Sequence, residues 1–187
     1  MKKILFILII FITISCSAQQ IYPLRTHYEI PENSYLKDTN NELQYYEGIW
    51  KTQWNGKITY IYLKKIINKY DNYIKEYRDI LVAKYKVTDG SGNLILFDNT
   101  NSSDNDSVLE GTYFRKQDDK YVLIYSDEDM CNRSGTILIN FTDSTKTQLQ
   151  WKYMPSENWI DDECWYYNFP PDQRPQPLPK EAIFTKQ

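Results

Sequence analysis

Two acidic clusters stand next to cysteines and are the first residues in the chain whose types could do chemistry. Residues 126–130 read SDEDM and precede Cys131, and residues 160–164 read IDDEC and end at Cys164. A glycosidase needs two carboxyl groups about 5 or 6.5–9.5 Å apart across a cleft. A disulfide would bring the clusters near each other, but their spacing defines no cleft. Exposed loop charge is therefore the preferred interpretation.

Other reactive residues lack the neighbours that chemistry requires. Asp98, Asp104 and Asp106 lie in DNTNSSDNDS, where hard oxygen ligands suit calcium, but the glycine of an EF-hand loop is missing. The one histidine, His27, lies in a polar segment without a rigid partner to hold it as a base. We therefore predict no catalytic residue, no metal site and no cofactor, and an enzyme is the less favoured class.

The N-terminus predicts export. Lys2 and Lys3 precede an apolar run, ILFILIIFITI, at residues 4–14. Eleven residues of helix rise about 16 Å, roughly half of the ~30 Å of hydrocarbon that a spanning helix crosses. A short apolar run after a basic start is typical of a secretion signal. We expect a signal peptide over residues 1–18.

Cys16 offers two sites of processing, and both remain open. A lipoprotein peptidase would cut before Cys16, where Ser15 is suitably small but Thr13 replaces the usual branched aliphatic residue. A general signal peptidase would cut after Ala18. We favour lipidation of Cys16, because a lone exposed thiol is a liability in an oxidising compartment. The expected location is the cell envelope, with a lipid anchor in the membrane; the alternative is a soluble periplasmic or secreted protein.

The two remaining cysteines, Cys131 and Cys164, allow a single disulfide. Closing that loop would stabilise the fold by roughly 3–4 kcal/mol. Two buried thiols are the alternative.

Composition favours strands and argues against nucleic acid as a partner. The chain has 17 Tyr, 5 Trp and 7 Phe against 6 Gly, and its net charge is −3, which becomes −5 without Lys2 and Lys3. An acidic chain without a basic stripe is a poor ligand for phosphates. Aromatic enrichment is typical of sheets.

Period-two patterns predict an all-β fold. Leu149, Trp151 and Tyr153 alternate with polar or flexible residues, and about ten such segments are separated by turns. We predict an antiparallel, lipocalin-like β-barrel or strongly curled sheet of about eight to ten strands over residues 46–187, after an extended lead-in over 19–45. Residues 64–81 also show helical spacing, but we expect two strands joined by a turn near residues 70–72.

Residues 45–51, YYEGIWK, resemble the G-x-W opening strand of lipocalin-like barrels. The resemblance implies that Gly48 lets the strand bend and that Trp50 plugs the closed end. Lipocalins place an arginine from a late strand over this tryptophan, whereas the last strand here offers Lys186.

A second resemblance covers nearly the whole chain. The segments SCSAQQIYPLRT, SYLKDTNNEL, GIWK, GTYF and LPKEAIFTKQ are similar to an uncharacterised family of small exported proteins of Gram-negative bacteria. It implies a barrel in the cell envelope and no particular activity.

These observations favour a non-catalytic role. We expect the barrel to bind a small apolar or amphipathic ligand, or an envelope partner. In the first case, four aromatic residues would line the core or a pocket: Trp50, Trp54, Tyr60 and Tyr62. The alternative is glycan binding on an outer face where Trp159 and Trp165 are exposed.

Overall fold

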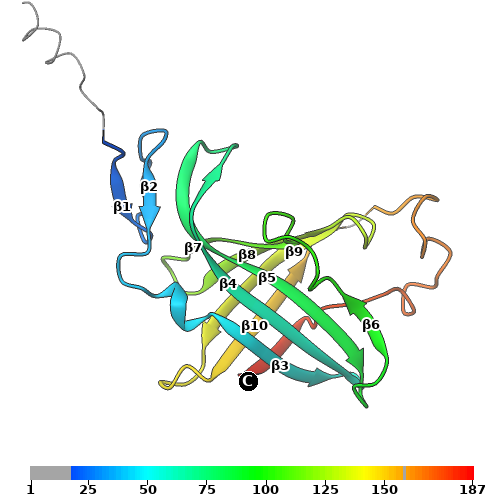
Figure 1. The fold of residues 1–187 in the computed structure, drawn as a ribbon. Coiled ribbons are helices and arrows are strands. Elements are labelled where there is room, and N and C mark those ends of the chain that lie inside the picture. Colours follow the sequence, from blue (N-terminus) through cyan, green and yellow to red (C-terminus); the bar gives the residue numbers. More distant parts are fainter. Residues whose placement is uncertain (1–17, 158) are drawn as a thin grey trace, which may run out of the picture.

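The computed structural model describes residues 18–157 and 159–187, and the described chain is built almost entirely of strands (Figure 1). Residues 1–17 of the expected signal peptide, Cys16 among them, lie outside the described residues. One short 3-10 turn, η1 (Leu43–Tyr45), is present. The strands are β1 (Ile21–Pro23), β2 (Tyr35–Lys37), β3 (Gly48–Trp54), β4 (Lys57–Asp71), β5 (Glu76–Asp89), β6 (Ile95–Asp98), β7 (Leu109–Phe114), β8 (Tyr121–Asp127), β9 (Arg133–Phe141), β10 (Gln148–Pro155) and β11 (Glu181–Lys186).

Eight strands close into an antiparallel barrel, which confirms the predicted fold. The ring runs in chain order through β3, β4, β5, β7, β8, β9, β10 and β11. It closes where β11 pairs with β3, with Lys186 opposite Trp50. Each strand thus neighbours the next one in sequence, as in an up-and-down barrel.

The three other strands lie outside this ring. The edge of β5 that faces away from β4 pairs first with β2 at Tyr77 and Arg78, then with β7 at Val82 and Ala83. It then pairs with β6. The β5–β7 pairing is short, and β2 and β6 pair with β5 on either side of it.

Residues 64–81 form strands, as predicted, although the turn lies later than expected, at residues 72–75. The register of β4 against β5 shifts between Ile66 and Lys69, where Asn68 has a positive φ of 56°. Such a bulge inserts residues into one strand and moves the apolar side chains to a new face. The shift accounts for the helix-like spacing of this stretch.

Large side chains fill the barrel interior. Trp151 and Tyr153 point inward with Leu149, as their alternation predicts. An eight-stranded barrel is just wide enough for its side chains to fill it. The largest fully buried residues of this core are Trp50, Trp151, Tyr121, Tyr125, Phe114, Phe184, Leu43, Ile61, Leu81 and Leu109.

A buried polar network fixes the lead-in to the barrel. Asp79 of β5 accepts hydrogen bonds from the Tyr35 hydroxyl at 2.5 Å and from the backbone N–H groups of Asp38 and Asn68. The Asp38 carboxylate in turn lies 2.8 Å from the Lys65 ammonium. From the sequence, we expect the chain before β3 to be an extended lead-in. Instead, these bonds and the pairing of β1 and β2 with the sheet hold it against the barrel.

Candidate functional site

The four aromatic residues of the predicted pocket do not share one surface. Trp50 is fully buried, and its indole N–H donates to the Tyr46 carbonyl at 2.7 Å. Trp54 is half-buried near the end of β3, where it donates to the Thr59 hydroxyl. On β4, Thr59, Ile61 and Leu63 are buried, whereas Tyr60 and Tyr62 alternate with them and point to the outside.

Lys186 occupies the place that a lipocalin gives to an arginine. Its ammonium lies 5.2 Å from the centre of the Trp50 ring and donates to the Tyr45 carbonyl. Gly48 has a φ of 124°, and a Cβ there would lie 3.2 Å from the Lys186 side chain. The glycine therefore gives both the bend of β3 and the room for Lys186, so the Trp50 end of the barrel is closed.

A disulfide holds the long segment between β10 and β11, the pinned segment, against the turn between β8 and β9. Cys131, in the turn between β8 and β9, is bonded to Cys164, in the segment between β10 and β11, which confirms the predicted pairing. Within that segment Tyr166 is fully buried and donates its hydroxyl to the Met130 carbonyl at 2.7 Å. The disulfide and this hydrogen bond hold a segment without strands against the barrel.

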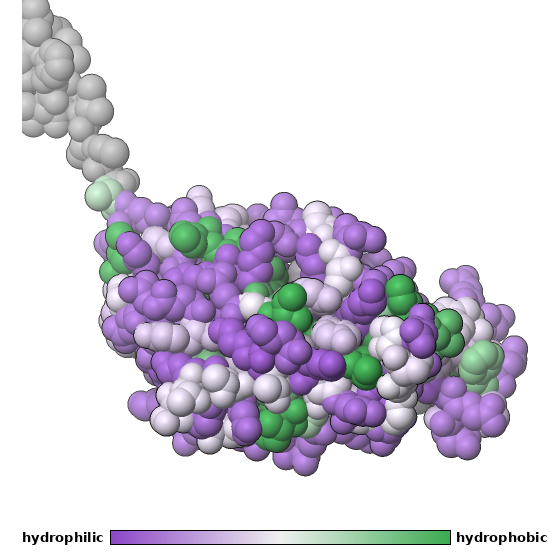
Figure 2. All heavy atoms as spheres, turned by 60° about the horizontal axis from the view of Figure 1, so that its bottom comes forward, coloured by the Kyte–Doolittle hydropathy of each residue, from purple (hydrophilic) through white to green (hydrophobic). Residues whose placement is uncertain are grey.

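The pinned segment carries two exposed tryptophans that line one pocket. Trp159 is 92% exposed and Trp165 is 57% exposed. Their pocket has a volume of about 380 Å³, and its wall includes the acidic residues Glu128, Asp129, Asp161 and Glu163. The segment is orange in Figure 1 and projects at the right end of Figure 2, away from the first described residues.

Trp165 is held in a fixed orientation, whereas Trp159 reaches into solvent. The Trp165 indole N–H donates to the Asp129 carbonyl at 3.1 Å. Its ring makes edge contacts with Tyr166 and Phe169. An oriented indole beside carboxylates offers an apolar face and hydrogen-bond acceptors to the same ligand.

A second pocket shares the Glu128–Asp129 corner. It has a volume of about 540 Å³ and runs along residues 99–108 to the end of β8. At its floor, the buried Asp127 accepts hydrogen bonds from the hydroxyls of Tyr85 and Tyr125 at 2.7 and 3.1 Å. Burial, followed by the Asp127 charge, raises the pKa of Tyr85, and burial also raises the pKa of Tyr125.

The raised pKa values of the buried tyrosines predict that the protein loses stability at alkaline pH. Burial raises the pKa of Tyr153 to about 12 and the pKa of Tyr121 as well, whereas unfolded tyrosines ionise near pH 10. Above about pH 10 the unfolded chain therefore binds fewer protons than the folded chain. The free energy of unfolding falls as the pH rises from about 10 to about 12. Tyrosinate absorbance and circular dichroism, followed together, should show the buried tyrosines ionising only as the barrel unfolds. Complete ionisation near pH 10 with the fold intact would contradict this.

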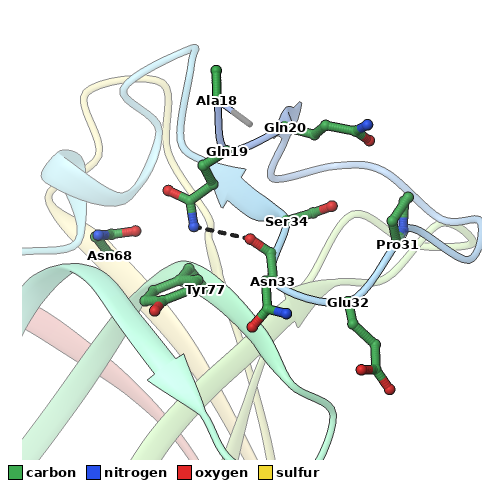
Figure 3. Close-up of a pocket in the computed structure, with 9 residues that line it drawn as sticks. All are labelled: Ala18, Gln19, Gln20, Pro31, Glu32, Asn33, Ser34, Asn68 and Tyr77. Carbon is green, nitrogen blue, oxygen red and sulfur yellow. Dashed lines mark hydrogen bonds between the residues drawn. The ribbon is translucent and has the colours of Figure 1, made fainter. Parts of the chain in front are cut away.

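The pocket in Figure 3 lies at the opposite end, beside the first described residues. It has a volume of about 620 Å³ and is lined mainly by polar side chains around the Tyr77 ring, including Asn33 and Asn68. The Gln19 amide donates to the Asn33 carbonyl at 3.0 Å across it (Figure 3). The pocket therefore lies between the start of the described chain and the hairpin of β4 and β5.

The other residues considered for chemistry are engaged elsewhere. Asp104 forms ion pairs with Lys64 and Lys84, and Asp98 lies 3.7 Å from the Lys86 ammonium. His27 lines a surface pocket with basic residues. Within residues 18–157 and 159–187, no group of His, Cys, Asp and Glu side chains could hold a metal ion, and no helix is long and apolar enough to cross a membrane.

The comparisons with known proteins identify a family and no activity. A model described as a family of unknown function, DUF6705, matches residues 1–187. The chain belongs to this family. No curated protein and no solved structure matches it. The expected membership in an uncharacterised family is thereby confirmed.

Sequence reasoning located part of the Trp159–Trp165 pocket and missed the rest. The sequence indicates an alternative binding surface with Trp159 and Trp165 exposed, and counting cysteines indicates the disulfide. The disulfide brings the two acidic clusters together, as their positions beside the cysteines predict. Sequence reasoning missed that Glu128 and Asp129 share a pocket with the two tryptophans about 30 residues downstream.

Proposed function

We propose that the protein is exported to the cell envelope of a Gram-negative bacterium and anchored there through an acylated Cys16. The basic start and the apolar run at residues 4–14 support export. The Cys131–Cys164 disulfide supports an oxidising compartment. Two or three acyl chains give stable membrane attachment, whereas one does not. Cleavage after Ala18, which yields a soluble periplasmic or secreted protein, is the alternative.

We propose further that the protein is a non-catalytic binding protein whose site is the pocket of Trp159 and Trp165. The observation that carries the proposal is the exposure of both indoles in one pocket that a disulfide holds in place. Two tryptophans exposed in the same pocket form an apolar patch, and such patches mark binding sites more often than single exposed apolar residues do. A disulfide reduces the conformational entropy lost when such a site orders around a ligand.

The chemistry of the pocket favours a saccharide. A sugar ring presents an apolar face of C–H groups to an indole and hydroxyl donors to carboxylates. The carboxylates of Glu128, Asp161 and Glu163 disfavour an anionic ligand. We therefore expect a neutral glycan or one that carries an amine, since a cation is attracted by both the carboxylates and the indole faces.

Binding of an apolar ligand inside the barrel has less support. Trp50 and Trp151 fill the interior together with buried tyrosines and phenylalanines, and Tyr60 and Tyr62 face outward. A ligand there would have to displace packed side chains.

Trp159→Ala is expected to weaken glycan binding by about tenfold or more, equivalent to about 1.4 kcal/mol. The measurement is isothermal titration or tryptophan fluorescence against a panel of neutral, amino and acidic glycans. Tyr73→Ala serves as the matched control, because Tyr73 is 94% exposed but belongs to the β4–β5 hairpin. We expect that control to bind like the original protein.

Two results would contradict the proposed site. One is binding of fatty acids or lipids, but no glycan, with Trp159→Ala unchanged. The other is hydrolysis of a glycan that is lost when Asp161 or Glu163 is replaced by its amide, which would make the protein an enzyme.

A further inference from the structure

The hairpin that joins β4 and β5 exposes apolar side chains at its tip. Tyr73 is 94% exposed and Ile67 is 69% exposed, and Tyr70 and Ile74 are partly exposed beside them. This hairpin rises beyond the barrel at the top of Figure 1. Exposed isoleucine at the end of a hairpin is a poor choice for a surface that meets only water.

The exposure of Ile67 is built into the fold. The bulge in β4 places Ile67 and Asn68 outside the regular pairing, and the Asn68 backbone N–H donates to the buried Asp79 carboxylate at 3.0 Å. At the turn, the Asp71 carboxylate accepts from the backbone N–H groups of Tyr73 and Ile74. These bonds fix the apolar side chains in an outward position.

Three basic residues around the tip are paired with carboxylates, and the Asp71 carboxylate is bound by backbone N–H groups of the turn. Lys75 lies 2.9 Å from Glu32, Lys69 lies 2.5 Å from Glu110, and Arg78 lies 2.8 Å from Glu76. Paired charges lower the cost of bringing the tip to an apolar boundary. We therefore expect the tip to bind a surface through its apolar side chains rather than through ionic contacts.

The tip lies beside the start of the described chain. Gln19 donates to the Asn33 carbonyl at 3.0 Å, and the Asn33 backbone N–H donates to the Lys75 carbonyl at 2.7 Å. Figure 3 shows the bond between Gln19 and Asn33 across the polar pocket. Cys16 precedes Ala18 by two residues, a span of about 7 Å at most.

We propose that the tip of the β4–β5 hairpin, residues 67–74, rests in the interface of the bilayer that holds the protein. This inference depends on the proposed acylation of Cys16. An anchor within a few residues of Gln19 brings the tip to the membrane surface, where tyrosine favours the interface and isoleucine the adjacent hydrocarbon. The barrel is then oriented, and its Trp159–Trp165 pocket points away from the membrane.

The test uses the acylated full-length protein in vesicles of phosphatidylcholine with brominated acyl chains, which quench nearby tryptophan. Tyr73→Trp adds a probe at the tip. Leu94→Trp is the control, because Leu94 is 60% exposed and is hydrogen-bonded to Asp89 at the far end of β5, about 45 Å along the strand. Co-flotation with the vesicles reports the anchor separately from the tip.

We expect both variants to float and the emission added by Tyr73→Trp alone to be quenched and shifted to shorter wavelength. Flotation without quenching of that emission would overturn the tip contact and leave the anchor in place. Equal quenching of both added probes would overturn the orientation. A failure to float, with a mass that lacks acyl chains, would overturn the anchor and this inference together. A loss of self-association on Tyr73→Ser would assign the tip to a second copy and also overturn it.

Discussion

Replacement of Asp79 by alanine is expected to lower the free energy of unfolding by about 3–5 kcal/mol. The carboxylate is 2% exposed and accepts three hydrogen bonds, from Tyr35, Asp38 and Asn68. Its removal leaves buried donors without an acceptor, and each such group costs about 1–3 kcal/mol. It also changes the balance of charge beside Lys65, which lies 4.0 Å away. Urea denaturation followed by circular dichroism measures the change.

Glu181→Ala is the matched control. Glu181 pairs with Lys152 at 3.3 Å, but its side chain is 71% exposed, so its removal should change stability by less than about 1 kcal/mol. Hydrogen exchange should also show that Asp79→Ala loosens the lead-in, including β1 and β2, more than the barrel strands. Equal stability of the two variants would show that the network does not hold the lead-in.

The double substitution Cys131→Ser with Cys164→Ser is expected to lower the free energy of unfolding by about 3–4 kcal/mol. The bonded cysteines are 33 residues apart, and a loop of that length restricts the unfolded chain by roughly this amount. The segment between β10 and β11 loses its covalent link to the β8–β9 turn, so glycan affinity should fall as well.

Reduction provides the control for the disulfide. Dithiothreitol should shift the denaturation midpoint of the original protein toward that of the double variant and should leave the variant unchanged. A midpoint that reduction does not move would mean that native packing, rather than the disulfide, holds the pinned segment.

The barrel could be predicted because its strands carry a simple alternation. Trp151 and Tyr153 alternate with polar neighbours, and the turns between such runs are rich in Gly, Asn and Asp. The plug at Trp50 follows from the G-x-W resemblance, and the disulfide follows from counting cysteines once Cys16 is set aside as either lipidated or removed.

Two other features could not be predicted. The inward face of β4 is hidden because both faces carry large side chains, and the buried Asp79 network joins residues that are far apart in the sequence. On β4, the large rings of Tyr60 and Tyr62 can pack in a core as Ile61 does, so the pattern does not say which face is inside. Asp79 lies in a mostly apolar stretch, and its bond with Tyr35 joins residues 44 positions apart. A short-range pattern carries no information about such a contact.

The central claim, that Trp159 and Trp165 form the ligand site, is tested most directly by the indole N–H signals of the five tryptophans. Protein labelled with ¹⁵N in tryptophan gives one resolvable signal for each indole, and single Trp→Phe variants assign them. On titration with a glycan that binds, we predict that the signals of Trp159 and Trp165 shift while those of Trp50 and Trp151 stay in place. Shifts of Trp50 and Trp151, produced by an apolar ligand and absent with glycans, would contradict this account and place the site inside the barrel.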